Sequence, residues 1–161
     1  AIVNAANSQM TGCYIPHHRC IDNCIHSYAG MQLRYACYQI MEKQEKQEAT
    51  GKAKITKAYN LPSRYILHTV GPIIYSTVTK KDEELLASCY RSCLELADAY
   101  HLESIAFCCI STGEFHFPKE LATKIAIKTV KEYLKNETNI KKVIFNVFKD
   151  EDRDIYERYL R

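Results

Sequence analysis

Apolar residues recur along the chain in two alternating patterns. Four short runs, three of them rich in Ile, Val and Phe, lack strict alternation with polar residues, which is typical of strands buried on both faces of a sheet. They cover residues 1–3, 65–70, 105–110 and 142–148. Longer segments carry apolar residues at steps of three and four, the period of an amphipathic helix. We therefore expect helices over residues 19–43, 82–100, 118–135 and 152–160.

Strands that alternate with helices predict an α/β fold with a mostly parallel sheet covered on both faces. The length of 161 residues suits one domain, and no repeat or low-complexity linker divides it. Residues 44–51 are polar and are interpreted as a surface turn. Ligands of such folds bind beyond the carboxyl ends of the strands, so residues 4–19, 71–81, 111–118 and 149–152 are the loops where function is expected.

Composition excludes some classes of function. Hydrophobic residues make up 47% and charged residues 25%, as in ordinary globular domains, and the formal net charge is a mild +3. No dense Lys/Arg run is interleaved with aromatic residues, so we expect no nucleic-acid partner. The nearest cluster, Lys52, Lys54 and Lys57, is interpreted as a solvated face. No run approaches the roughly 18 apolar residues of a membrane span.

The chain contains eight cysteines, which in a small secreted protein would indicate disulfides. Here Cys89 and Cys93 are four apart in a helical pattern, while Cys108 and Cys109 lie in an apolar, strand-like run. These residues are interpreted as reduced, buried, small hydrophobic side chains. We therefore expect a cytoplasmic protein.

The first candidate motif is Asn4-Ala5-Ala6-Asn7, directly after the first strand. Asn side chains both donate and accept hydrogen bonds, and small Ala residues let a ligand approach the backbone. An ordinary turn is the alternative, because Asn favours turns. The position at a strand end favours a ligand loop.

The second motif places two Cys and two His within eight residues, just before the first long helix. These side chains suit zinc, and Cys13, His18 and Cys20 are the three expected ligands. Three ligands would leave a fourth position for water or substrate. The spacing alone does not distinguish His17 from His18, and reduced core cysteines beside a solvent-facing His pair are the alternative.

Asp22 and His26 form a third candidate pair, because residues four apart share one face of a helix. Near a helix start, the macrodipole stabilises a carboxylate and also attracts phosphate. A surface capping carboxylate and a packing histidine are the alternative.

The fourth motif is the segment from Ser111 to Pro118, between a strand and a helix. Its backbone N–H groups and hydroxyls could wrap a diphosphate, and Phe115 could pack on a sugar. An ordinary strand–helix loop is the alternative. The Gly-Lys-Ser/Thr signature is absent, so hydrolysis of nucleoside triphosphates is not expected.

Together, residues 1–7, 20–30, 68–72 and 110–113 resemble macrodomains, in the same order along the chain. Macrodomains are three-layer α/β/α domains built on a mixed, mostly parallel sheet, and they bind ADP-ribose. Ordinary members carry a run of glycines where this chain has residues 13–20. In that segment it is similar to the zinc-containing bacterial branch, which is often encoded beside a sirtuin-like ADP-ribosyltransferase.

The resemblance implies a role for particular residues. Asn7 matches an asparagine that contacts the distal ribose, Asp22 an acidic residue that orients the ribose or its attacking water, and His26 the histidine beside it. Cys13, His18 and Cys20 match zinc ligands, which favours His18 over His17. The implied ligand-binding set is Ala6, Ser111, Thr112, Gly113, Glu114, Phe115, Asn146 and Phe148, with Asn146 and Phe148 flanking adenine.

The activity implied is zinc-dependent hydrolysis at C1″ of the distal ribose, releasing ADP-ribose from a protein side chain to which a carboxylate ester links it. The alternatives are a module that binds ADP-ribose without cleaving it, an O-acetyl-ADP-ribose deacetylase, and a purely structural zinc site. Two departures from the family pattern stand out: His116 replaces a glycine, and Glu114 replaces a small aliphatic residue. Family members also have residues before Ala1, including an Asp at the adenine amine, so the sequence is expected to begin inside the fold.

Overall fold

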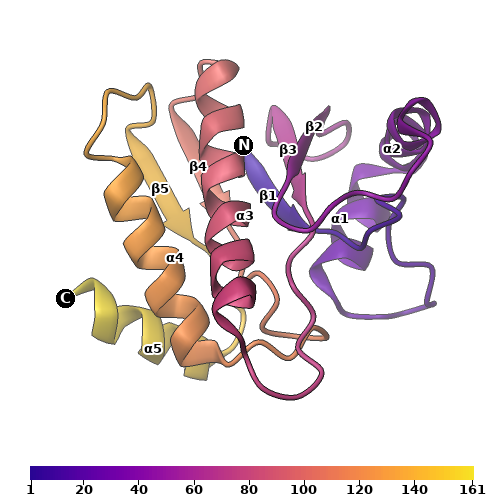
Figure 1. The fold of residues 1–161 in the computed structure, drawn as a ribbon. Coiled ribbons are helices and arrows are strands. Elements are labelled where there is room, and N and C mark those ends of the chain that lie inside the picture. Colours follow the sequence, from indigo (N-terminus) through magenta and orange to yellow (C-terminus); the bar gives the residue numbers. More distant parts are fainter.

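The computed structural model describes residues 1–161 as a five-stranded sheet flanked by helices (Figure 1). The strands are β1 (Ile2–Ala5), β2 (Ala53–Lys57), β3 (Tyr65–Thr69), β4 (Ser104–Phe107) and β5 (Lys142–Phe145). Their order in the sheet is β2-β3-β1-β4-β5, and only β2 runs antiparallel to its neighbour. The expected mixed, mostly parallel α/β sheet is therefore confirmed.

Helices cover both faces of this sheet. The helices are α1 (Ile21–Ala29), α2 (Met31–Gln44), α3 (Lys80–Ala99), α4 (Lys119–Tyr133) and α5 (Asp150–Leu160). Figure 1 shows α3 and α4 side by side in front of the sheet and α1 and α2 together at the edge near β2 and β3. The last helix, α5, packs beside α4.

Alternate side chains of β1 and β3 enter two separate cores. Val3, Leu67 and Phe107 join the larger core, which α3 and α4 complete. The next residue on the other face of β3, Ile66, joins the smaller core beneath α1 and α2. Each such fully buried side chain stabilises the fold by about 1.5 to 3 kcal/mol relative to exposure.

The edge strand β2 was not expected from the sequence, because its five residues alternate only weakly between apolar and polar. Lysines at a sheet edge discourage pairing with another chain, which fits the solvated face expected for this segment. However, Lys54 Nζ lies 3.3 Å from a carboxylate oxygen of Glu48, whose side chain is buried. The polar segment 44–51 is therefore not a surface turn throughout.

The single helix expected over residues 19–43 is two helices that meet at Gly30. This residue has φ 92° and ψ 176°, a conformation open essentially to glycine alone. A Cβ atom added there would lie 2.8 Å from Asn60 Nδ2. The break turns the chain, so that α1 and α2 both pack on one face of the sheet.

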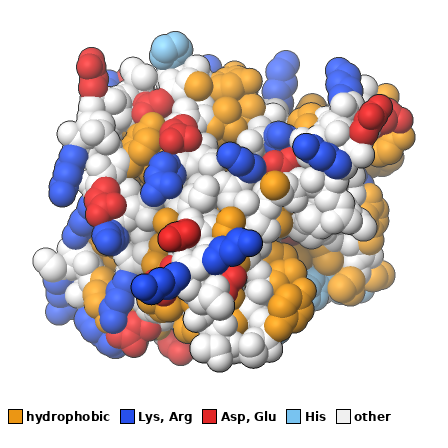
Figure 2. Space-filling model, viewed as in Figure 1, with side chains coloured by type: hydrophobic (Ala, Val, Ile, Leu, Met, Phe, Trp, Pro, Cys, Tyr) orange, Lys and Arg blue, Asp and Glu red, His pale blue; other side chains and the backbone are white.

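The surface charge, the thiols and the hydropathy of the helices each add one observation. On the face shown in Figure 2, Lys and Arg lie among Asp and Glu, so this face presents no large patch of a single charge. All eight cysteines are free thiols. None of the five helices combines the length and apolar character required to cross a bilayer.

We predict that Gly30→Ala lowers the free energy of unfolding by about 2 kcal/mol, because the new side chain is strained at this backbone conformation. For a domain of this size, that corresponds to a fall in Tm of roughly 4 to 8 °C. Thermal denaturation measures it. Gly113→Ala is the matched control, since a Cβ atom there meets no atom within 4 Å. Equal Tm values for the two variants would contradict the prediction.

Candidate functional site

The candidate site lies where the parallel strands β1 and β4 end and their loops begin. Residues 6–20 connect β1 to α1, and residues 108–118 connect β4 to α4. Seven non-glycine residues of the chain have positive φ, and four of them, Met10, His17, Ser111 and His116, lie in these two loops. Such strained backbone persists where the surroundings impose it, and it often marks a binding site.

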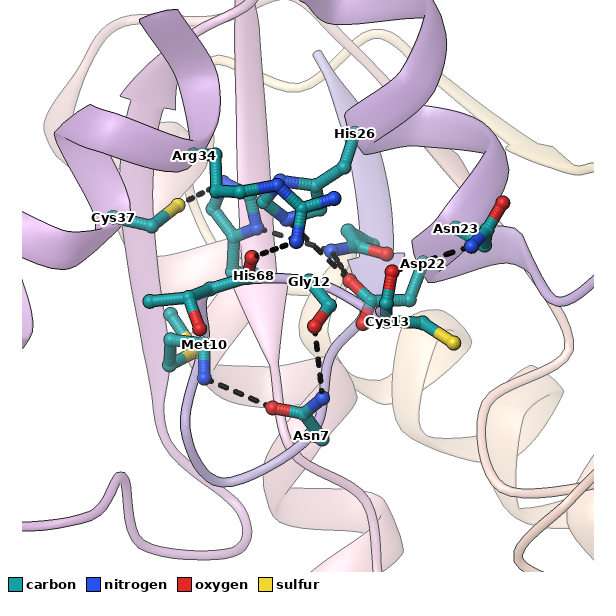
Figure 3. A network of polar contacts seen from close by, with 12 residues as sticks. Asn7, Met10, Gly12, Cys13, Asp22, Asn23, His26, Arg34, Cys37 and His68 are labelled. Atoms are coloured by element: carbon teal, nitrogen blue, oxygen red, sulfur yellow. Dashed lines mark hydrogen bonds and ion pairs between the residues drawn. The ribbon is translucent and has the colours of Figure 1, made fainter. Parts of the chain in front are cut away.

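Asp22 is the central carboxylate of the site (Figure 3). It lies in the first turn of α1, because Cys20 caps the helix and its Sγ accepts the N–H of Asn23 at 3.3 Å. The Asp22 side chain is buried, and Asn4 Nδ2 donates to its Oδ1 at 2.8 Å. Burial raises the pKa of the Asp22 carboxyl above its usual value, and the hydrogen bond from Asn4 offsets part of this rise.

Asn4 also connects Asp22 to a fully buried histidine. Its Nδ2 lies 3.1 Å from His68 Nδ1, and His68 Nε2 lies 2.9 Å from Thr56 Oγ1. Since the amide can only donate to Nδ1, the His68 proton is on Nε2. Burial lowers the pKa of His68 to about 3, so the imidazole is neutral near pH 7.

His26 lies on the same face of α1 as Asp22, as expected. Its Nε2 is 3.5 Å from Asp22 Oδ1, and burial lowers the pKa of His26 to about 4. A neutral imidazole at this distance makes a weak polar contact with the carboxylate rather than an ion pair. His26 is thus a buried, neutral group beside Asp22.

The loop after β1 is held closed by Asn7. Asn7 Oδ1 accepts the N–H groups of Gln9 and Met10 at 3.0 and 3.1 Å, and Nδ2 approaches the carbonyl of Gly12 at 3.4 Å (Figure 3). The side chain expected to meet the distal ribose therefore also shapes its own loop. Gly12 has φ 90°, and a Cβ atom there would lie 2.7 Å from His26 Cγ.

Arg34 from α2 is the cation of this network. Its Nη1 donates to the carbonyl of Thr11 at 2.6 Å, and its guanidinium lies 4.3 Å from the centre of the Tyr14 ring. Its positive charge lowers the pKa values of both Asp22 and His26, although burial is the larger influence on each.

The three residues expected to bind metal lie together in the loop before α1. One ligand atom from each of Cys13, His18 and Cys20 lies within 4.8 Å of the others, and Cys13 Sγ is 3.4 Å from His18 Nδ1. His17 is outside this group. Asn23 Nδ2 donates to the carbonyls of Cys13 and Ile15 at 3.2 and 3.0 Å, which fastens the loop to α1. Two thiols and one imidazole that converge without backbone movement fit a zinc ion.

The loop after β4 carries the residues expected to meet a diphosphate. Phe117 donates its N–H to the carbonyl of Ser111 at 2.9 Å, and Thr112 Oγ1 donates to the carbonyl of Cys109 at 3.1 Å. Phe115 is half-buried, and its carbonyl accepts the N–H of Ile74 at 2.9 Å. Gly113 faces open space, so a ligand can approach its backbone.

Several polar atoms of the site are buried without a hydrogen-bond partner. They are Asn4 Oδ1, Ser111 Oγ and both ring nitrogens of His26. An unsatisfied buried polar atom costs about 1 to 3 kcal/mol. These atoms are concentrated at the carboxyl ends of β1 and β4 and on α1, which distinguishes this region from the rest of the chain, where Glu48 Oε2 is the remaining example.

The other expected ligand residues lie on either side of this region. Ala6 is buried, and its N–H donates to the carbonyl of Thr69 at 2.9 Å. Asn146 and Phe148 follow β5; Asn146 is exposed and Phe148 is 89% exposed. An aromatic ring so exposed leaves its face free for stacking.

Two shallow hollows of about 240 and 320 Å³ lie elsewhere, around β2. Both are lined by residues such as Lys57 and Tyr59, and neither includes Asp22 or the Cys/His group. The candidate site is therefore identified by its polar network and its helix terminus rather than by the depth of a hollow.

Sequence reasoning missed the roles of Asn4, His68 and Arg34. Asn4 and His68 lie within the motifs already noted, and His68 interrupts the apolar run of β3. A polar residue inside an apolar strand must find a buried partner, and this signal could have identified His68. Nothing in the periodicity marks Arg34.

The chain is similar to known proteins in sequence and in fold. The family model described as Macro domain matches residues 3–126. The chain is 54% identical over 160 residues to a protein-ADP-ribose hydrolase of Treponema medium, covering 99% of the chain and 61% of the relative. It is 54% identical over 157 residues to a protein of that name from Staphylococcus aureus strain MSSA476, covering 97% and 59%. The chain thus spans about three fifths of the length of these relatives.

A solved structure shows the same architecture. A mutant of the Oceanobacillus iheyensis macrodomain with ADPR superimposes with a TM-score of 0.89 and 39% sequence identity. The match covers 99% of this chain and 83% of that one.

The buried histidines predict a loss of stability in acid. The unfolded chain takes up protons on its imidazoles near pH 6.5, whereas folded His26 and His68 remain neutral until about pH 4 and 3. The free energy of unfolding therefore falls as the pH decreases from 7.5 to 5.0, by roughly 2 kcal/mol for each imidazole. The raised pKa of Asp22 acts in the opposite direction, at lower pH.

Urea denaturation at several pH values measures this dependence. His26→Gln should remove about half of the slope, while His101→Asn, at an exposed histidine, should leave it unchanged. A stability that does not change between pH 7.5 and 5.0 would show that these imidazoles are not held neutral.

Proposed function

The chain belongs to the macrodomain family, and from this premise we propose that it is a protein-ADP-ribose hydrolase that releases mono-ADP-ribose from modified side chains. The observation that carries the proposal is the buried Asp22 carboxylate, held by Asn4 at the start of α1 and adjacent to the Cys13, His18 and Cys20 loop. The hydrolase relatives, at 54% identity, support it.

The reaction is hydrolysis at C1″ of the distal ribose. A water oxygen forms a bond to C1″, the bond from C1″ to the side-chain oxygen breaks, and one proton of the water is released. The ribosyl carbon gains oxocarbenium character as that bond lengthens. We propose a carboxylate ester as the linkage, because a carboxylate is a good leaving group and needs little help from a general acid.

Asp22 orients the ribose and the water. One of its oxygens is fixed by Asn4 Nδ2, and an ionised carboxylate has room for further donors. A ribose hydroxyl or a water can therefore donate to Asp22 without displacing Asn4. Asn7 and His26 are proposed to contact the same ribose. Holding the reacting groups in place supplies much of the rate acceleration.

The diphosphate is bound by the loop after β4 and by the start of α1. The unsatisfied N–H groups and the dipole of a helix N-terminus attract anions. The hydroxyl of Ser111 is buried without a partner, and we propose that it turns toward a phosphate oxygen when the ligand binds. Gly113 leaves the backbone accessible, Phe115 packs against the distal ribose, and Asn146 and Phe148 flank the adenine.

We propose Zn²⁺ as the cofactor, held by Cys13, His18 and Cys20. When bound, zinc would supply a Lewis acid that polarises an oxygen of the ribose or of a water. The protein side of this arrangement is the loop itself, which Asn23 fastens to the same turn of α1 that carries Asp22.

The proposal extends to the cellular setting. A mono-ADP-ribosylated protein is the substrate, and a sirtuin-like ADP-ribosyltransferase is the proposed source of the modification. Burial raises the pKa of the thiol of Cys37 to about 12 and that of Cys89 to about 11. Unreactive buried thiols suit a reducing compartment, so we propose the cytoplasm.

The first test is Asp22→Asn. We expect it to slow single-turnover release of ADP-ribose from a carboxylate-linked substrate by about 100-fold or more. Its affinity for ADP-ribose, measured by calorimetry, should change far less, because the amide can still bind the sugar. Asp154→Asn, at an exposed aspartate of α5, is the matched control and should retain the wild-type rate.

Full turnover by Asp22→Asn would sink the proposed role of this carboxylate. If the wild-type chain binds ADP-ribose tightly but releases none from the modified protein, it is a binding module instead.

The second test concerns the metal. Chelation should abolish the release of ADP-ribose, and added Zn²⁺ should restore it. His18→Gln should lose both the metal and the activity. His17→Gln, one residue away and not among the three grouped residues, should keep both. Metal content by mass spectrometry and the release assay together measure this. Undiminished release after complete removal of the metal would contradict the zinc-dependent mechanism.

A further inference from the structure

Glu114 is an acidic residue in a loop proposed to bind an anion. It stands between Gly113 and Phe115 in the loop after β4, and its side chain is 69% exposed. A free carboxylate at this position would repel a diphosphate, because like charges oppose each other even where water screens them. A side chain of the loop before α1 contacts this carboxylate.

The partner of Glu114 is the imidazole of His18. Glu114 Oε1 lies 3.5 Å from His18 Nε2, and no Lys or Arg side chain lies within 4 Å of the Glu114 carboxylate. The other ring nitrogen of His18, Nδ1, faces Cys13 Sγ at 3.4 Å. The two nitrogens of His18 therefore face two different loops: Nδ1 faces the thiols and Nε2 faces the carboxylate.

This orientation suits a histidine that binds metal through Nδ1. When a metal occupies one ring nitrogen, the proton of the neutral imidazole resides on the other, and that N–H is usually held by a carboxylate or a carbonyl. Here the remaining N–H would be on Nε2, the nitrogen beside Glu114. The carboxylate would fix both the tautomer and the orientation of the ring.

We infer that Glu114 is a positioning residue, which holds His18 for a divalent metal and thereby couples the metal loop to the ligand loop. The second part of this inference rests on the proposed binding of ADP-ribose. Metal binding at Nδ1 would fix the N–H donor of His18 on Nε2, beside Glu114. The Glu114 carboxylate would then be turned toward His18 and away from the diphosphate. Coupling of this kind is reciprocal: ADP-ribose must strengthen metal binding as much as the metal strengthens ADP-ribose binding.

The first experiment uses Zn²⁺ alone, with no ADP-ribose present. Competition with a chromophoric chelator measures the zinc affinity of the full chain and of Glu114→Gln, Glu114→Ala and Glu137→Gln. Loss of a carboxylate behind a metal-bound histidine weakens binding by about 10-fold or more. We expect this loss for Glu114→Ala and a smaller loss for Glu114→Gln, whose amide oxygen can still accept.

The matched control is Glu137, an exposed glutamate without an ion pair, whose replacement should leave zinc affinity unchanged. Wild-type affinity in Glu114→Ala would overturn the inference while leaving the zinc site itself intact. Absence of zinc binding by the wild-type chain would overturn both.

The second experiment measures ADP-ribose affinity by calorimetry with and without Zn²⁺. In the wild-type chain, zinc should tighten ADP-ribose binding about 5-fold or more. Without zinc, Glu114→Ala should bind ADP-ribose more tightly than the wild type, because a repelling charge is gone, and zinc should then have less effect. The same zinc effect in Glu114→Ala as in the wild type would overturn the coupling. If no form binds ADP-ribose, the proposed function fails, whereas the zinc measurement still tests the positioning role of Glu114.

Discussion

One hydrogen bond, from the Asn4 amide to the Asp22 carboxylate, organises the rest of the site. The carboxylate is buried, and a buried charge is tolerated only where donors replace the water it has lost. Asn4 is suited to this role because it lies on β1, in the middle of the sheet, where β3 pairs with its backbone. Asn4 pairs with His68 across β1 and β3, so the register of the two strands places an acceptor, His68 Nδ1, beside the same amide. A slip of β1 by one residue would turn Asn4 to the opposite face, away from His68.

The same arrangement explains why the core beneath α1 and α2 is small. Its six buried apolar residues share that side of the sheet with Asn4, Asp22, His26 and His68. Polar groups there contribute little net stability, and those without partners reduce it. The larger core, with 18 buried residues on the α3 and α4 side, supplies the apolar burial that offsets this cost. The α3 and α4 side of the sheet therefore contributes most of the stability, and the α1 and α2 side carries the polar residues of the candidate site.

Much of this architecture follows from patterns in the sequence, but the edge strand β2 and the break between α1 and α2 do not. The strands at 65–70 and 142–148 and the helices at 82–100 and 118–135 are found within a few residues of their expected bounds, because continuous apolar runs and helical periods reflect burial directly. The weakly alternating β2 and the break at Gly30 escaped this reasoning. β2 is recognisable only from its pairing with β3, and Gly30 only from a backbone angle. By contrast, Cys13, His18 and Cys20 are close in sequence and could be grouped as expected metal ligands. The link between Asn4 and His68 spans 64 positions and depends on strand register.

The charge balance of the site shows why a metal would matter to an anionic ligand. Arg34 is the cation that acts on Asp22 and His26, and it is already engaged by the Thr11 carbonyl and the Tyr14 ring. Lys119, at the start of α4, is paired with Glu151 and Asp152. Glu114 adds a negative charge to the loop that should face the diphosphate. The N-termini of helices supply only about half a positive charge each, within one turn. A divalent cation on the Cys13 loop would add the largest local positive charge. Under the inference drawn above, His18 would transmit its effect to the phosphate loop through Glu114.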